Sequence, residues 1–238
     1  MDEQPANATF GRRLGLDPAE FIKANMRLAP VPSVPEIRLY LAHPGSGLRQ
    51  LLEPGGEDDA DETLPEPQPP YWAYAWAGGT VLARYVLDRP SVVSGRRVLD
   101  LGAGSGLVGI AAAKAGAREV TAAEIDRSGI VALGLNAAAN DVAIRTIAED
   151  ITVGSPPEVD LVLAGDIFYG QDVAERVMPF LDRCLTAGIG VLVGDPGRAW
   201  LPRQRLCLLG ESLVPDVGGN GGGEGKPSGV FAFVPAGG

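Results

Sequence analysis

Hydrophobic and polar positions along the middle of the chain alternate between two patterns. Short apolar runs of strand length are separated by longer segments in which apolar residues recur at helical spacing. The pattern predicts strands at 97–101, 119–125, 144–148, 159–164 and 189–193, and helices at 80–88, 107–115, 128–140 and 172–185. Such alternation is typical of a parallel sheet covered by helices on both faces.

The two ends of the chain depart from this alternation. Asp17 followed by Pro18 is a helix-start pattern and predicts a short helix to about Leu28. The remaining terminal elements are a predicted strand at 36–41, a helix at about 200–209, and strands at 212–214 and 229–234. The predicted fold is therefore α/β: a doubly wound, Rossmann-like, seven-stranded sheet. It is mostly parallel, with an antiparallel C-terminal hairpin and an N-terminal extension of a helix and a strand.

Composition changes this picture in two places. Residues 53–70 are acidic and rich in proline, which predicts an exposed loop or a linker. We therefore expect residues 1–70 to form an N-terminal extension and residues 71–238 to form the main domain. The formal net charge of −10, with no cluster of Lys and Arg, argues against nucleic acid as a partner.

The scarcity of some residue types excludes several classes of site. The single histidine, His43, argues against a His-based zinc site and against a Ser-His-Asp triad. Cys184 and Cys207 both lie in segments predicted to be apolar helices, so we expect two small core residues, no disulfide framework and no metal. No signal-peptide pattern and no apolar run of membrane-spanning length are present, so we expect a cytoplasmic protein without membrane attachment.

A glycine-rich loop, DLGAGSG, follows the first strand of the main domain and opens a helix. Glycines allow a tight turn and a close approach to a ligand, and the helix start offers free N–H groups. Leu107 stands where a dinucleotide-binding loop has its third glycine, which disfavours a dehydrogenase. A carboxylate at Asp100 would attract a cation, so we expect S-adenosylmethionine rather than a loop that needs glycine only for packing. The expected cofactor contacts here are Asp100, Gly102, Ala103, Gly104 and Gly106.

Acidic residues also end the second and third strands. Glu124 is placed to accept the ribose hydroxyls, with Ile125 beside it in the same cofactor site. Asp126 lies past the strand end, where it either points the same way or caps the next helix. Asp150 can accept from the adenine amino group, with Ile151 against the ring, although a loop acid is as often merely solvated.

The fourth strand ends in the sequence GDIFY, and ligands of open α/β sheets bind beyond the carboxyl ends of the strands. Asp166 can orient an amine, and the ring of Tyr169 tolerates a cationic methylammonium product. We therefore expect Asp166 and Tyr169 to be catalytic and Phe168 to lie on the substrate side. The alternative for Asp166 is a cap on the following helix or its loop.

An aromatic stretch, PPYWAYAWAGG at 69–79, precedes the first helix of the main domain. We expect Trp76 and Gly78 to form a wall of the cofactor site, with glycine letting the backbone approach the ligand. Trp72 and Tyr71 are expected on the substrate or partner side, and Tyr74 is expected in the core.

These motifs together resemble the seven-β-strand methyltransferases. DLGAGSG, AAEID, GDIFY and GDPGR (194–198), preceded by PYWAYAWAGG, are similar within them to family 16, whose members are mostly protein-lysine methyltransferases. The likeness is greatest to the electron transfer flavoprotein β-subunit lysine methyltransferases and their bacterial relatives, and it runs from about Phe21 to Val234. Two features depart from the family: the long acidic loop, and Ala77 where relatives usually carry proline.

The resemblance implies roles for matching residues. Asp100, Gly102, Gly104 and Glu124 would hold S-adenosylmethionine with Trp76 packed beside it. Asp166 and Tyr169 would face the target lysine, whereas the GDPGR segment has no assigned role. We expect an S-adenosylmethionine-dependent protein-lysine N-methyltransferase that acts on the electron transfer flavoprotein β subunit. The alternatives are another protein substrate such as a ribosomal protein, a small-molecule amine, and a non-enzymatic cofactor-binding module.

Overall fold

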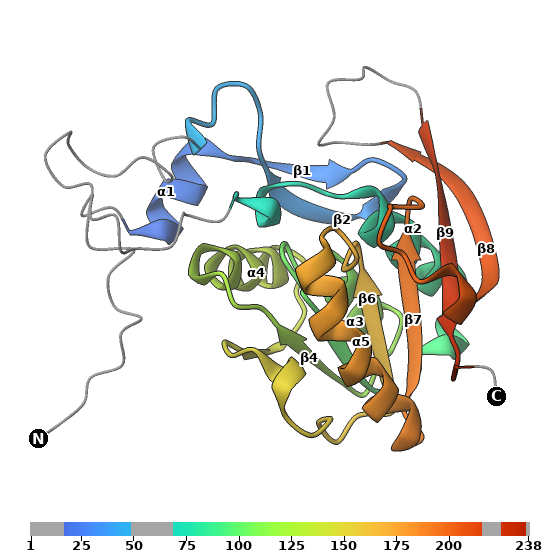
Figure 1. Cartoon of the computed structure of the whole chain (residues 1–238). Coiled ribbons are helices and arrows are strands. Elements are labelled where there is room, and N and C mark those ends of the chain that lie inside the picture. The colour runs from blue at the N-terminus through green and yellow to red at the C-terminus, as the bar shows by residue number, and fades with distance from the viewer. Residues whose placement is uncertain (1–16, 49–68, 216–224, 237–238) are drawn as a thin grey trace, which may run out of the picture.

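The computed structural model describes residues 17–48, 69–215 and 225–236, so most of the acidic segment at 53–70 lies outside the described residues. The helices are α1 (Pro18–Asn25), α2 (Ala77–Asp88), α3 (Leu107–Lys114), α4 (Arg127–Ala139) and α5 (Gln171–Thr186) (Figure 1). The strands are β1 (Arg27–Val31), β2 (Val34–Leu41), β3 (Arg97–Leu101), β4 (Glu119–Ala123), β5 (Arg145–Ile147), β6 (Leu161–Gly165), β7 (Gly190–Asp195), β8 (Leu206–Pro215) and β9 (Gly225–Phe233).

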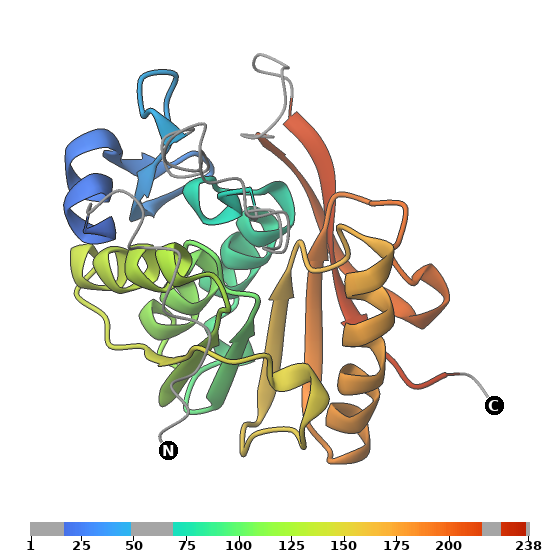
Figure 2. The same cartoon turned by 60° about the vertical axis from the view of Figure 1, so that its left-hand side comes forward.

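Seven of these strands form one sheet with the order β5-β4-β3-β6-β7-β9-β8. The pairs from β5 to β7 are parallel, whereas β9 runs antiparallel to both β7 and β8. The strand order reverses next to β3 (Figure 2), and ligands of open α/β sheets bind beyond the carboxyl ends of the strands at such a point, which here are the ends of β3 and β6. The predicted fold class is confirmed, including the antiparallel closing hairpin.

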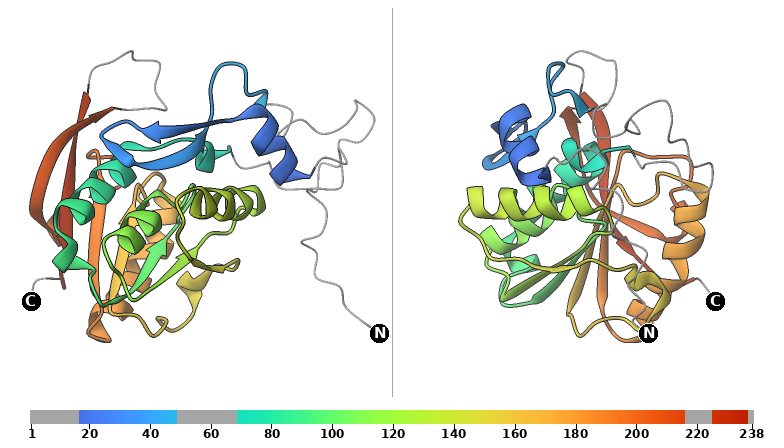
Figure 3. Two further views of the ribbon diagram at one scale, coloured as in Figure 1. Left: turned by 180° about the vertical axis from the view of Figure 1, so that it is seen from behind. Right: turned by 90° about the vertical axis from the view of Figure 1, so that its left-hand side faces the viewer.

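Helices cover both faces of the sheet, as the right-hand view of Figure 3 shows. On one face, α2 and α3 bury an apolar layer that includes Leu82 and Ile110. On the other face, α5 buries a second layer that includes Phe180 and Leu181. The central strands are apolar on both sides for this reason, and their continuous apolar runs made them recognisable in the sequence.

The N-terminal hairpin of β1 and β2 is fastened to the main domain. Leu39 is fully buried in the same cluster as α2 and α3. Two buried asparagines, Asn136 of α4 and Asn140 at its C-cap, hold the edge of β2. Asn136 Oδ1 accepts from Tyr40 N at 2.8 Å, and Asn140 Oδ1 accepts from Arg38 N at 3.0 Å. Side-chain amides thus replace a neighbouring strand along this edge.

Three expectations about local structure are wrong. The N-terminal helix ends at Asn25, and the chain turns at once into β1, which the sequence pattern did not indicate. The predicted helix at 200–209 is a short 3-10 turn followed by β8, because residues 206–215 pair along almost their whole length with β9. Cys207 therefore lies exposed on a strand, whereas Cys184 is a buried residue of α5 as expected.

No helix among the described residues is long and apolar enough to cross a membrane.

Four glycines let α2 begin directly on the strand ends. A Cβ built on Gly78 would lie 2.3 Å from the carbonyl oxygen of Gly194, and one built on Gly194 would lie 2.2 Å from the carbonyl oxygen of Gly78. A Cβ on Gly165 would lie 2.7 Å from the Cα of Gly79. Backbone therefore packs on backbone where α2 meets β6 and β7.

We expect Gly78→Ala to destabilise the protein by about 1–3 kcal/mol or more, because its methyl group meets a backbone carbonyl that cannot rotate away. Gly134→Ala is the matched control: Gly134 lies exposed within α4, and nothing lies within 4 Å of an added Cβ. The control is expected to gain about 0.5–1 kcal/mol from helix propensity. Chemical denaturation of both variants measures the difference, and equal stabilities would contradict the close packing.

Candidate active site

The carboxyl edge of the sheet brings together segments that are far apart in the sequence. A Cβ on Gly102, at the end of β3, would lie 2.7 Å from Cδ1 of Ile167, which follows β6. A Cβ on Gly104 would lie 3.7 Å from the Cα of Trp72 in the aromatic stretch. The glycine loop, the end of β6 and the aromatic stretch therefore meet at one place.

The glycine loop has the backbone that its sequence demands. Gly102, Gly104 and Gly106 all have positive φ, at 67°, 52° and 81°. The amides of Gly102 and Ala103 both donate to Ala123 O at 3.0 Å, which ties the loop to β4. Gly102 is exposed and Ala103 and Gly104 are partly exposed, so the open face of the loop is a cradle that side chains would fill. Gly106 is buried instead and packs against Leu133 of α4.

Glu124 braces the same loop. Its Oε2 accepts from Gly104 N at 2.6 Å, and its Oε1 accepts from Ile125 N and Asp126 N at 2.8 Å each. A carboxylate offers about four acceptor positions, so one remains on Oε2 for a ligand hydroxyl among the contacts described. Burial raises the pKa of Glu124 above its ordinary value, and these backbone donors oppose that rise.

Asp100 lies beneath the loop rather than on it. The residue is 1% exposed, and its Oδ2 accepts from Gly109 N at 2.7 Å, which ties β3 to α3. Burial raises the pKa of this carboxyl to about 7, and the nearby charge of Glu124 adds to the rise. Asp100 is thus placed to act on a ligand by its charge from behind the loop, and it ionises near neutral pH.

Two further cofactor candidates, Ile125 and Asp150, lie farther along the edge. Ile125 is 56% exposed, so its side chain is open to a ligand beside Glu124. Asp150 caps the turn after β5, where its Oδ1 accepts from Thr152 N at 2.9 Å and from Thr152 Oγ1 at 2.5 Å. Asp126 caps α4 through Ser128 N, which decides between the two readings of that residue.

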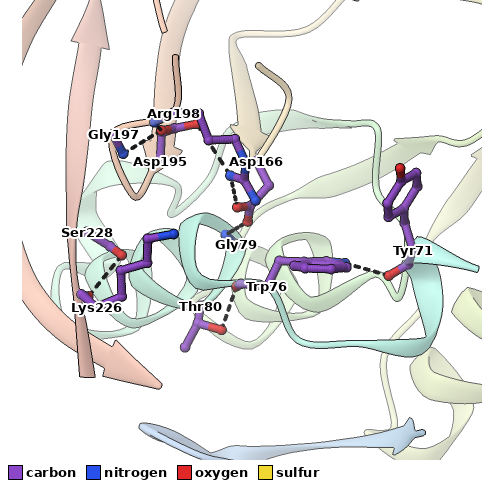
Figure 4. Close-up of polar contacts among 10 residues, drawn as sticks. All are labelled: Tyr71, Trp76, Gly79, Thr80, Asp166, Asp195, Gly197, Arg198, Lys226 and Ser228. Carbon is purple, nitrogen blue, oxygen red and sulfur yellow. Dashed lines mark hydrogen bonds and ion pairs between the residues drawn. The ribbon is translucent and has the colours of Figure 1, made fainter. Parts of the chain in front are cut away.

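Asp166, at the end of β6, has an unusual backbone conformation. It has a φ of +57°, a conformation that costs a non-glycine residue energy and that tends to occur at functional sites. Its Oδ2 accepts from Gly79 N in the first turn of α2 at 2.5 Å, and its Oδ1 accepts from Arg198 (Figure 4). The N-cap of α5 is Gly170, without a side-chain cap, so Asp166 does not cap the following helix.

Three aromatic rings, from the aromatic stretch and from the segment after β6, lie close to one another. The ring centroids of Tyr71 and Tyr169 are 5.4 Å apart, and those of Tyr71 and Trp76 are 5.9 Å apart. Trp76 Nε1 donates to Tyr71 O at 2.7 Å, which fixes the indole (Figure 4). Tyr71 and Tyr169 are 42% and 47% exposed, so they form an open aromatic rim, and burial raises the pKa of Tyr169.

Three expected contact residues lie elsewhere than their predicted roles require. Trp72 is 3% exposed and packs in one cluster with Ile22 of α1 and with Met26, which directly follows that helix. Trp72 therefore supports the aromatic stretch from the core. Phe168 is fully buried in the layer under α5. The backbone of Gly78 approaches Gly194 rather than open space. Trp72 and Phe168 each lie next to an exposed tyrosine, Tyr71 and Tyr169, and sequence adjacency alone cannot tell a lining side chain from a supporting one.

The sequence pattern gave no role to two residues that complete the site. Arg198 pairs with Asp166, and its Nη1 also lies 3.5 Å from Asp195 Oδ2. Asp195 Oδ1 accepts from Gly197 N at 2.6 Å and from Arg198 N at 2.7 Å, which shapes the loop after β7. The signal that could have found them is their position, since charged residues directly after a buried parallel strand lie on the ligand-binding edge.

Comparisons with known proteins agree with this arrangement. The family model described as ribosomal protein L11 methyltransferase (PrmA) matches residues 78–168. The electron transfer flavoprotein beta subunit lysine methyltransferase of Danio rerio is 44% identical over 153 residues, covering 62% of this chain and 59% of that protein. The protein of that name from Xenopus laevis is 37% identical over 187 residues, covering 76% of this chain and 71% of that protein.

Solved structures support the fold. The ribosomal protein L11 methylase from Lactobacillus delbrueckii subsp. bulgaricus matches with a TM-score of 0.50 and 22% identity, over 68% of this chain and 81% of that one.

The alignments with the first mammalian and fish relatives span between 50% and 60% of those proteins. The Xenopus laevis relative is matched over more than two thirds of its length. The chain therefore belongs to the family of the electron transfer flavoprotein beta subunit lysine methyltransferases.

Proposed function

We propose that this protein is an S-adenosylmethionine-dependent protein-lysine N-methyltransferase whose substrate is the electron transfer flavoprotein β subunit. The observation that carries the proposal is the Asp166 carboxylate, which accepts from Gly79 N at the start of α2 and belongs to a residue of positive φ at the end of β6, where the next residue, Ile167, meets the glycine loop. The names of the relatives supply the substrate, because several are called lysine methyltransferases of that subunit.

The residues at the carboxyl edge fit S-adenosylmethionine. The exposed backbone of Gly102 and the partly exposed Ala103 and Gly104 leave room that a side chain would fill. Glu124 retains an acceptor position for a ribose hydroxyl, and the buried Asp100 favours a positively charged ligand above the loop. When bound, this cofactor supplies a methyl group on a sulfonium.

The chain's own residues would then hold the lysine. Asp166 accepts a hydrogen bond from the lysine nitrogen and directs that nitrogen toward the glycine loop. The loop is near because a Cβ on Gly102 would already touch Ile167, the residue that follows Asp166. A lysine that binds as an ammonium first releases a proton to solvent, because only the neutral amine has a lone pair to attack the methyl group. Methyl transfer then puts one positive charge on that nitrogen, which exposed rings such as those of Tyr169 and Tyr71 can stabilise by cation–π attraction. Catalysis of this kind depends mostly on alignment, which can contribute factors of about 10⁵ or more.

The overall charge suits a lysine-bearing partner. The formal net charge of −10 attracts basic surfaces over the range of the Debye length, about 8–10 Å at physiological salt. The exposed ring of Trp200, two residues after Arg198, offers a partner a further aromatic contact on this side of β7. Exposed aromatic residues of this kind are typical anchors at protein interfaces.

The substrate is tested by incubating the purified protein with S-adenosylmethionine labelled in its methyl group. One reaction contains the electron transfer flavoprotein β subunit, a second contains ribosomal protein L11, and a third contains a small-molecule extract. We expect label on lysine residues of the β subunit. Label that appears only on L11 or only in small molecules would contradict the proposed substrate class.

The role of Asp166 is tested by Asp166→Asn, which keeps an acceptor for Gly79 N but removes the charge. A hydrogen bond to a charged group contributes about 1.5–3 kcal/mol, so kcat/KM for the protein substrate should fall about 10- to 100-fold. Cofactor affinity should stay within about threefold, because Asp166 is not part of the glycine loop. Asp141→Asn is the matched control, because Asp141 is exposed, has a φ of +56° close to that of Asp166 and precedes β5, and it should leave both quantities unchanged. Loss of cofactor binding in Asp166→Asn would show that its role is misassigned.

The charge of Asp100 predicts a pH dependence of cofactor binding. With a pKa of about 7, this carboxyl is neutral below that pH and ionised above it. Affinity for the cationic cofactor should therefore rise from about pH 6 to about pH 7.3, a range in which the cofactor's own amino group stays mostly protonated because the pKa of an α-amino group is about 7.7–8.0. Asp100→Asn preserves the bond from Gly109 and should make the affinity lower and independent of pH in this range. A profile that is unchanged in the variant would exclude Asp100 as the cause.

A further inference from the structure

Arg198 occupies the place on Asp166 that a substrate ammonium would need. Its Nη1 pairs with Asp166 Oδ1, while Gly79 N uses Oδ2 (Figure 4). Asp166 is partly reachable from solvent, with 11% of its side chain exposed, and Arg198 is exposed to 22%. A lysine that entered the rim between the aromatic rings would thus meet a carboxylate that already holds a cation.

Asp195 provides a second position for the same guanidinium. The side chain of Asp195 is fully buried, and its Oδ2 accepts no hydrogen bond from any described residue. That oxygen lies 3.5 Å from Arg198 Nη1, which is an ion pair but longer than a hydrogen bond. Charge-assisted N–H···O bonds are about 2.7–2.9 Å long, so a shift of less than about 1 Å would complete one.

The loop does not need the guanidinium to hold its shape. Asp195 Oδ1 already accepts from the backbone amides of Gly197 and Arg198. These two bonds fix the backbone of Arg198, whereas its side chain is shared between two carboxylates. A side chain that is fixed at its base and has two acceptors within reach can change partner without any refolding of the loop.

The charges of the cluster favour one additional cation. Two carboxylates, Asp166 and Asp195, face the single guanidinium of Arg198. Burial raises the pKa of Asp195, because water cannot reach and stabilise its charged form. Moving Arg198 closer to Asp195 would satisfy that buried group and at the same time free Asp166 for an incoming ammonium.

We propose that Arg198 is an exchangeable stand-in for the substrate: it occupies the ammonium position on Asp166 until a lysine displaces it onto the unpartnered oxygen of Asp195. The inference rests on the proposed function only in naming lysine as the displacing group. Arg198 and Asp195 are thus positioning residues, and Asp166 is the group that contacts the substrate. The exchange favours cationic side chains, because an uncharged nucleophile cannot replace the charge that Arg198 withdraws.

The proposal separates the effects of two variants. Asp195→Asn keeps the acceptor for the loop amides but removes the charge that receives Arg198, so Arg198 stays on Asp166 and competes with the substrate. We expect the KM for the β subunit to rise about tenfold while kcat stays within about threefold. Arg198→Gln removes the competitor, and in that background Asp195→Asn should change KM by less than about threefold. Thermal unfolding should show Asp195→Asn to be at least as stable as the wild type.

A purely structural role gives a different pattern. If Arg198 only closes the loop, both single variants weaken binding through loss of order, and their effects add in the double variant. Equal effects of Asp195→Asn in the presence and absence of Arg198 would therefore overturn the proposal. A loss of stability in Asp195→Asn would do so as well, because it would show that the buried charge is already well paired.

Binding of n-butylammonium, a lysine side-chain analogue, provides a test that does not depend on the protein substrate. Its affinity is measured by calorimetry in the presence of S-adenosylhomocysteine, for the wild type, both single variants and the double variant. We expect about tenfold tighter binding in Arg198→Gln and weaker binding in Asp195→Asn. The same affinity in all four proteins, or no measurable binding to Arg198→Gln, would overturn the exchange. Failure to methylate the β subunit would instead contradict only the proposed substrate.

Discussion

The contact between the backbones of Gly78 and Gly194 determines the geometry of the whole site. Because neither residue has a side chain, the first turn of α2 lies directly on the end of β7, and Gly165 allows the same approach to β6. The amide of Gly79 is thereby brought to Asp166, and the positive end of the helix stabilises that carboxylate. Any side chain at this junction would separate the helix from the strands and withdraw the amide from the acid.

Carboxylates held by backbone amides recur along the carboxyl edge. Glu124 is held by Gly104, Asp100 by Gly109, Asp166 by Gly79 and Asp195 by Gly197. One donor to each carboxylate is a glycine, and at Gly109 the missing side chain matters directly, since an added Cβ would lie 3.0 Å from Asp100 Oδ2. This arrangement fixes several negative charges next to the site that we propose receives a sulfonium and a lysine. Of these four carboxylates, Asp166 and Asp195 share one cation of the chain, Arg198. In the proposed exchange, the position of the Arg198 side chain therefore depends on what the site has bound.

Much of this architecture could be predicted from the sequence, for identifiable reasons. The central strands are buried on both faces, so their apolar runs stand out, and the acids that end them lie on one edge whatever the details of packing. The helix expected at 200–209 failed because β8 is formed by pairing with β9, a distant partner that local propensity does not register. Trp72 and Phe168 were expected to line the site but are core residues, since the direction of a side chain in an irregular segment depends on tertiary packing. The pairing of Arg198 with Asp166 spans 32 residues and follows only from the folded loop.

Asp166 is the residue on which the proposed mechanism depends, because it is the group that receives the substrate nitrogen. A crystal structure of the protein with S-adenosylhomocysteine and a lysine-bearing segment of the electron transfer flavoprotein β subunit tests that claim most directly. We expect the lysine nitrogen within about 2.7–3.2 Å of an Asp166 carboxylate oxygen, with the guanidinium of Arg198 on Asp195. A lysine bound elsewhere on the edge, with Arg198 still paired to Asp166, would contradict it.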